Sequence, residues 1–184
     1  VIELTFKRYV ISSTTGPPIR VVFFLGCEKM NIYVCSDESG VFDCVHNEYF
    51  VFGGIVFFSA EEKEKRTRMY LSVEKQIRCS EKIKPGKEVK ATSISNKSKA
   101  SLFRSLNNVY KFGAVIDQKR ILPEIFDNKK SKQRYLDYAY KISVKRFFQN
   151  MISEGIINPK EVDNIYFYIS IRNGLMKPTL KLKL

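Results

Sequence analysis

The sequence predicts an α/β protein built on a mixed β-sheet that is flanked by helices. Four runs rich in β-branched and aromatic residues have the length of strands, and charged segments with apolar residues at helical spacing lie between them. Strands that alternate with helices are typical of a sheet with helical layers on its faces. The chain has 184 residues and 44% hydrophobic content, which is enough for one sizeable core.

The expected elements follow one another in a simple order. The predicted strands are residues 31–35 and 49–58, a short one at 112–116, and a last one at 164–171. The predicted helices are residues 60–78, 97–108 and 132–153. The first helix opens with a capping-box pattern, Ser59 to Glu62, and the third ends before Gly155 and Pro159. The chain order is therefore strand, strand, helix, short helix, strand, long helix, strand.

The first 29 residues do not resemble the rest of the chain. They contain the breaker cluster Thr14–Pro18 and then the apolar run Val21–Leu25, which is too brief for a membrane span. We expect the folded domain to start near Met30, so that residues 1–29 are an N-terminal extension or an over-assigned start. Residues 30–173 then form the domain, and residues 174–184 form a tail.

The charge balance is the strongest bulk signal. The chain has 32 Lys and Arg against 19 Asp and Glu, a formal charge of +13. Such an excess attracts polyanions, of which nucleic acid is the commonest, although lysine-rich compositions also occur in proteins that bind none. Charge does not separate RNA from DNA. The sequence predicts no membrane partner and leaves the oligomeric state open.

Cysteine and histidine usage argues against two kinds of chemistry. The four cysteines form no C-x-x-C pair and show no zinc-ligand spacing, and His46 is the single histidine. Zinc sites and Ser-His-Asp mechanisms both lack the residues that they need. Thiols without a disulfide pattern are expected in a reduced compartment, which predicts a cytoplasmic protein.

The first candidate site is the segment Asp37–Gly40, at the end of the first predicted strand. Two carboxylates, Asp37 and Glu38, arrive there together, and Ser-Gly then supports a turn. Burying charge at a strand end is costly unless something offsets it, and a divalent metal ion is a common partner. The alternative is that both acids are solvated turn residues.

The second candidate is Glu88, in the lysine-rich segment Lys87–Thr92 that precedes a predicted helix. Carboxylates that face one another across a sheet edge hold magnesium for phosphodiester cleavage, because the ion takes oxygen ligands and activates water. Lys87 and Lys90 could contact a nucleic-acid backbone or orient Glu88. The alternative is a solvated glutamate paired with a lysine, which contributes little.

Taken together, these motifs resemble the family designated domain of unknown function 3800 (DUF3800), over residues 30–173. The stretches that carry the likeness are Tyr33–Gly40, Tyr49–Val56, Lys87–Ala91 and Tyr138–Lys141. The resemblance implies an RNase H-like fold and a nuclease or phosphoesterase that uses Mg²⁺ or Mn²⁺. It also implies that Asp37 and Glu88 are catalytic metal ligands, and that Glu38 and Lys90 are supporting catalytic residues.

The sequence departs from the family pattern near its C-terminus. Ser170 and Ile171 stand where the resemblance leads us to expect two acids before Arg172-Asn173, and the further element that should follow is missing. We therefore expect a C-terminally truncated domain that binds magnesium poorly. This leaves open both an active hydrolase and a non-catalytic basic module that binds nucleic acid or another partner.

Overall fold

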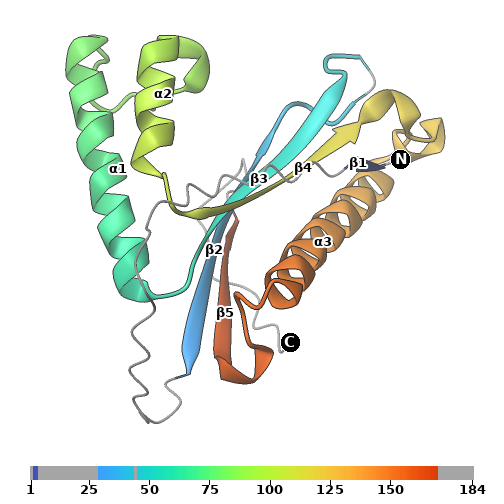
Figure 1. Cartoon of the computed structure of the whole chain (residues 1–184). Helices are drawn as coiled ribbons and strands as arrows, with labels where there is room; N and C mark the ends of the chain where they lie inside the picture. Colours follow the sequence, from blue (N-terminus) through green and yellow to red (C-terminus); the bar gives the residue numbers. More distant parts are fainter. Residues whose placement is uncertain (1, 4–28, 44, 170–184) are drawn as a thin grey trace. The chain divides into compact units, whose positions relative to one another are not determined.

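The computed structural model describes residues 2–3, 29–43 and 45–169, which form two compact units (Figure 1). Unit 1 comprises residues 1–56 and 110–184, and unit 2 comprises residues 57–109. The sequence predicts a single domain over residues 30–173, whereas the contacts divide that range. The division arises because two helices between the third and fourth strands pack on each other. The predicted tail, residues 174–184, lies outside the described residues.

Unit 1 contains a five-stranded sheet and one long helix. In chain order its elements are β1 (Ile2–Glu3), β2 (Met30–Ser39), β3 (Tyr49–Phe57), β4 (Tyr110–Asp117), α3 (Lys129–Ser153) and β5 (Val162–Ile169). The strands lie in the order β1-β4-β3-β2-β5. β2 and β5 are parallel, and β4 is antiparallel to both β3 and β1. The predicted α/β class with a mixed sheet is therefore confirmed.

The N-terminal strand is short. Ile2 and Glu3 pair with Ile116 and Val115 of β4. This strand falls within the range that the sequence analysis set outside the fold, so two residues of that range extend the sheet. Residues 4–28 lie outside the described residues.

Helix α3 covers one face of the sheet (Figure 1). It begins three residues before the predicted start, because the Asn128 side chain accepts the Ser131 N–H and caps it. Its buried stripe packs against the sheet, with Phe147 lying 5.5 Å from Phe112 of β4 between ring centroids. The buried helix residues are Ala139, Ser143, Val144, Phe147, Phe148 and Met151. We call the covered side of the sheet the α3 face.

Close packing on the α3 face depends on one glycine of β3. A Cβ added to Gly54 would lie 2.3 Å from Cε1 of Phe112, far inside contact distance. The absent side chain at Gly54 makes room for this ring, which is 5% exposed. The opposite surface of the same strand is different, because a Cβ added to Gly53 would meet nothing within 4 Å.

Unit 2 is a pair of helices, α1 (Ala60–Ser80) and α2 (Asn96–Ser105). The predicted cap of α1 is present, since Ser59 Oγ accepts the Glu62 N–H at 3.0 Å. Glu81 joins the two helices, because its Oε1 accepts Ser98 Oγ–H at 2.7 Å and Ser95 N–H at 3.1 Å. None of the helices in the described part of the chain has an apolar stretch of sufficient length to cross a bilayer.

Candidate functional site

Asp37 lies within the last residues of β2, not in the turn that follows. The strand extends to Ser39, beyond the predicted residues 31–35, and Gly40 (φ +104°) ends it. Side chains alternate along a strand, so neighbours point to opposite faces. Ser36 is buried on the α3 face, and Asp37 is exposed on the other side, which we call the opposite face. Asp37 is therefore exposed, as the alternative of a solvated residue predicted, but it belongs to the strand and not to the turn.

One glycine stands beside Asp37 on the opposite face, and a second lies one strand further along the sheet. A Cβ on Gly40 would lie 3.6 Å from Cα of Phe50, which places the residue that follows β2 beside Phe50 of the neighbouring strand β3. Asp37 precedes Gly40 by three residues, and Gly53 follows Phe50 by three residues. Because β2 and β3 run in opposite directions, Asp37 and Gly53 lie beside each other. Gly53 in turn pairs with Gly113 of β4. The sheet next to the Asp37 carboxylate therefore carries no side chains on two successive strands.

A second contact shows that β2 and β3 are antiparallel. A Cβ on Gly54 would lie 3.1 Å from the carbonyl oxygen of Cys35, whereas Gly40 lies beside Phe50. Advancing along β2 from Cys35 to Gly40 thus corresponds to moving backward along β3 from Gly54 to Phe50. The two strands run in opposite directions.

The position of Asp37 coincides with the point where the order of the strands reverses. From β2 the chain runs to β3 and β4 on one side, and then returns through α3 to β5 on the other side. β2 and β5 are parallel, with Ser36 beside Ile169, so their carboxyl ends share one edge of the sheet. Ligands of open α/β sheets bind at the carboxyl ends of strands at such a reversal. Asp37 is thus at the expected place for a site.

Tyrosine rings line the β2–β5 pair leading to Asp37. Tyr33 and Tyr166 are register partners whose rings stack at 5.1 Å between centroids, 16° from parallel. Both alternate with buried residues, which puts them on the opposite face with Asp37. This face therefore presents tyrosines, glycines and a carboxylate in place of a uniformly apolar surface.

The residue preceding Asp37 anchors the strand end to α3. Ser36 Oγ and the Tyr140 hydroxyl lie 2.8 Å apart, within hydrogen-bond distance. Burial raises the pKa of the Tyr140 phenol, so it stays neutral and can donate at any ordinary pH. The hydrogen bond fixes the backbone of β2 one residue before Asp37.

Glu38 is half-buried, and its backbone N–H donates to Asp37 Oδ1 at 2.8 Å. Within the described residues, Asp37 Oδ2 takes part in no hydrogen bond. The Asp37 carboxylate therefore keeps an oxygen that can contact a ligand.

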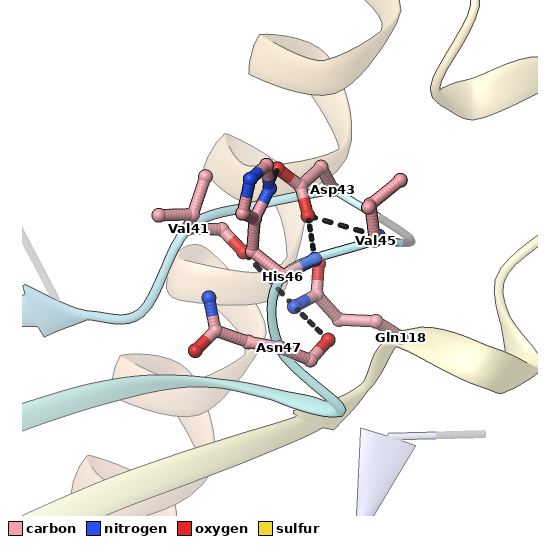
Figure 2. Close-up of polar contacts among 6 residues, drawn as sticks. All are labelled: Val41, Asp43, Val45, His46, Asn47 and Gln118. Carbon is pink, nitrogen blue, oxygen red and sulfur yellow. Dashed lines mark hydrogen bonds and ion pairs between the residues drawn. The ribbon is translucent and has the colours of Figure 1, made fainter.

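The loop after β2 contains a polar pair that the sequence analysis did not find (Figure 2). Asp43 Oδ2 lies 2.6 Å from His46 Nδ1, and Asp43 Oδ1 accepts the N–H groups of Val45 and His46. These hydrogen bonds from His46 and Val45 lower the pKa of the Asp43 carboxyl. The His46 ring is exposed, and Asp43 orients it. The D-x-x-H spacing is the sequence signal for such a turn.

A buried glutamine holds this loop against the end of β4. Gln118 is 2% exposed, and its Nε2 donates to the carbonyl oxygens of Val41 and Asn47 at 3.0 and 2.9 Å (Figure 2). Its backbone N–H donates to the Glu48 carbonyl at 2.9 Å. A small pocket of about 140 Å³ is lined by Val45, His46, Asn47, Glu48, Gln118 and Lys119. Gln118 therefore fixes both ends of the loop beside the Asp37 edge.

Glu88 and Lys90 lie in unit 2, in the segment between α1 and α2. Both are exposed, and Lys90 is the residue directly before a short 3-10 helix, Ala91–Ser93. The segment is held by Arg78, whose Nη1 donates to the Lys87 carbonyl at 2.6 Å. Arg78 is itself oriented by Glu74, at 2.7 Å. The backbone next to Glu88 is thus positioned by a two-residue clamp.

The structure brings Asp37 and Glu38 together, and Glu88 and Lys90 together, but each pair lies in a different unit. The pairing of Asp37 with Glu88 stays a prediction. Among residues 2–3, 29–43 and 45–169 there is no group of three or more His, Cys, Asp and Glu side chains placed to hold a metal ion. Ser170 and Ile171 lie outside the described residues.

Comparison with known proteins gives no family. No protein-family model matches the sequence, and no similar protein was found among the curated proteins or the solved structures.

Proposed function

We propose that this protein is a Mg²⁺- or Mn²⁺-dependent hydrolase of phosphodiester bonds in nucleic acid, on an RNase H-like sheet related to the DUF3800 family. One observation carries the proposal. Asp37 presents an exposed carboxylate at the carboxyl end of a parallel strand pair, beside a strip of sheet without side chains. Ligands of open α/β sheets bind outside the carboxyl ends of the strands, at a point where the strand order reverses.

The donor set fits a hard divalent cation. Carboxylate oxygens are its preferred ligands, and Mg²⁺ is usually held by one or two protein carboxylates together with substrate phosphates. Asp37 supplies such an oxygen from an exposed carboxylate, and the family resemblance implies Glu88 as the second ligand. When bound, the ion supplies activation of water and neutralisation of charge at the scissile phosphate.

The chain's own residues would position the substrate. Gly53 and Gly113 leave space for a phosphate-sugar backbone to approach the sheet next to Asp37. Glu38 donates its N–H to Asp37 and so orients the carboxylate. Lys90 adds positive charge beside Glu88, where it can contact a phosphate.

The second candidate is a basic module that binds nucleic acid without cleaving it. It is favoured by Ser170 and Ile171, which stand where the family resemblance predicts acids, together with the charge of +13. The two candidates differ in one measurable property, because only the hydrolase shortens its substrate. For either candidate we propose a cytoplasmic location, in keeping with a sequence whose cysteines show no disulfide pattern.

The test is a cleavage assay of end-labelled RNA and DNA with Mg²⁺ or Mn²⁺. We expect metal-dependent cleavage that falls about 100-fold or more in Asp37→Asn, because a metal ligand contributes at least as much as the residues that orient ligands. Asp163→Asn is the matched control. It makes the same charge change at the amino end of β5, on the opposite edge of the same strand pair.

Glu88→Gln tests the second ligand and should lower cleavage to a similar extent. Activity that is unchanged in Asp37→Asn would remove the proposed role of this residue. Salt-sensitive binding without cleavage by the wild-type protein would establish the second candidate instead.

A further inference from the structure

The outward side of α3 carries a row of three cations and one exposed tyrosine. Arg134, Tyr138, Lys141 and Lys145 follow one another at intervals of four, three and four residues. At about 100° per residue, this spacing places all four within an arc of about 60° on the helix. The row is about 17 Å long, since a helix rises 1.5 Å per residue.

The row is solvent-accessible and its charges are not neutralised. Arg134, Lys141 and Lys145 are exposed, and none of them forms an ion pair within the described residues. The only acid between Lys129 and Ser153 is Asp137, against seven Lys and Arg. Asp137 Oδ1 accepts a hydrogen bond from Gln133 Nε2 at 2.8 Å. The helix therefore presents a strongly basic surface.

Tyr138 is the unusual member of the row. Its side chain is 62% exposed, whereas Tyr135 and Tyr140 of the same helix are half-buried against the core. A large aromatic ring between cations, held out into solvent, does not contribute to packing of the fold. Aromatic rings flanked by basic residues bind single-stranded nucleic acid, because bases stack on the ring and phosphates contact the cations.

We propose that the row Arg134, Tyr138, Lys141 and Lys145 is a binding surface for single-stranded nucleic acid. This proposal rests on the proposed function, which supplies nucleic acid as the class of substrate. It adds that the nucleic acid is single-stranded and that it contacts the protein on α3. Charge complementarity identifies a polyanion as the occupant. The exposed tyrosine favours unpaired bases over a duplex, whose bases are already stacked.

A membrane surface is the competing occupant for a basic amphipathic helix. A helix that lies in a membrane interface buries its apolar side among the lipids. In α3 that side is already buried, since Ala139, Val144 and Phe147 are at most 7% exposed. Only the basic side of the helix is therefore available to a partner. A basic side without an exposed apolar side suits the phosphate backbone of nucleic acid better than a bilayer.

The test measures binding of fluorescein-labelled 20-nucleotide oligo(dT) and oligo(U), and of a duplex of equal length, by fluorescence anisotropy in EDTA. We expect tighter binding of the single strands. Tyr138→Ala should weaken single-strand binding about fivefold or more and leave duplex binding unchanged, whereas Tyr138→Phe should retain the affinity. Lys141→Gln with Lys145→Gln should reduce the slope of log affinity against log salt by about 1.4.

The control pair is Lys97→Gln with Lys99→Gln, which makes the same charge change on exposed residues of α2. An equal or larger loss in that pair would overturn the proposal, as would a Tyr138→Ala variant with wild-type affinity. Binding to phosphatidylserine vesicles in place of oligonucleotides would assign the row to a membrane.

The assay separates this proposal from the proposed hydrolase, because it contains no metal and does not depend on Asp37. If the row binds single strands but no cleavage is found, the hydrolase fails and the binding surface stands. If cleavage depends on Asp37 but the row variants bind and cleave normally, the binding surface fails and the hydrolase stands.

Discussion

The two faces of the sheet in unit 1 are made by the same strands but have opposite composition. The α3 face is filled by large apolar residues, of which Phe50 and Phe52 are 2% and 7% exposed. The opposite face carries Asp37, Gly53 and Gly113 at the corresponding positions. Because side chains alternate along a strand, one stretch of sequence builds the core and leaves room for a site. Substitutions one residue apart should therefore affect different properties.

The largest expected effect is the loss of a core ring. Phe50→Ala removes a ring that packs edge-to-face on Phe42 and Phe52, and we expect a loss of about 3–5 kcal/mol in the free energy of unfolding. Its neighbour Val51 is half-buried on the opposite face, and Val51→Ala should cost only about 1 kcal/mol. Urea unfolding of Phe50→Ala and Val51→Ala measures the loss in the free energy of unfolding for each variant. Equal losses would contradict the difference between the faces.

The adjacent glycines of β3 sharpen the same comparison. Gly54→Ala forces a methyl group against the Phe112 ring and should cost about 1–3 kcal/mol. Gly53→Ala meets no atom within 4 Å and should change stability by less than about 0.5 kcal/mol. The midpoints of urea unfolding of the two variants measure this difference in stability. If Gly53→Ala proved the more destabilising, our assignment of the faces would be wrong.

The Ser36–Tyr140 hydrogen bond gives a smaller effect on the α3 face. Tyr140→Phe removes the hydroxyl and leaves Ser36, which is 6% exposed, without this partner, at a cost of about 1 kcal/mol. Adding Ser36→Ala should recover part of that loss, since both polar groups are then absent. Full additivity of the two single losses in the double variant would show that the hydroxyls do not interact.

The smallest effect concerns pH and the loop between β2 and β3. The pKa of Asp43 is lowered by the hydrogen bonds from His46, so its contribution to the loop is present above its ordinary pKa. That contribution is lost as pH falls below about 4, through the folded-state pKa. Hydrogen exchange of the Val45 and His46 amides should speed up in this range, after correction for intrinsic rates. Exchange of core amides in β3 should not follow it.

The sequence predicted the helices and strands well because their signals are local. Apolar spacing, the cap at Ser59 and the helix breakers Gly155 and Pro159 located the elements within a few residues. The predicted strand ended at residue 35, just before the Asp37 segment, whereas β2 continues to Ser39 and includes Asp37, since strand pairing with β5 extends the ladder past the apolar run. The side chains of residues 32–37 alternate as they do in a strand. The sequence alone does not show, however, that this segment pairs with β5.

Other features of the site depend on contacts distant in sequence. Gln118 lies in a charged run that reads as a solvated loop, yet it is buried because it satisfies the carbonyls of Val41 and Asn47. The neighbouring positions of Gly53 and Gly113 follow from the register of β3 and β4, which single-sequence patterns do not specify. The separation of residues 57–109 as a unit likewise arises from packing between α1 and α2.

The most direct test of the central claim is where a metal ion binds on the sheet. Substoichiometric Mn²⁺ added to ¹⁵N-labelled protein broadens the amide signals of nearby residues. We predict selective broadening at Asp37, Gly53 and Gly113 that disappears in Asp37→Asn, while signals around Asp163 at the other end of β5 stay sharp. Broadening that persists in Asp37→Asn, or that centres on Asp163, would contradict the assignment of the opposite face as the reaction site.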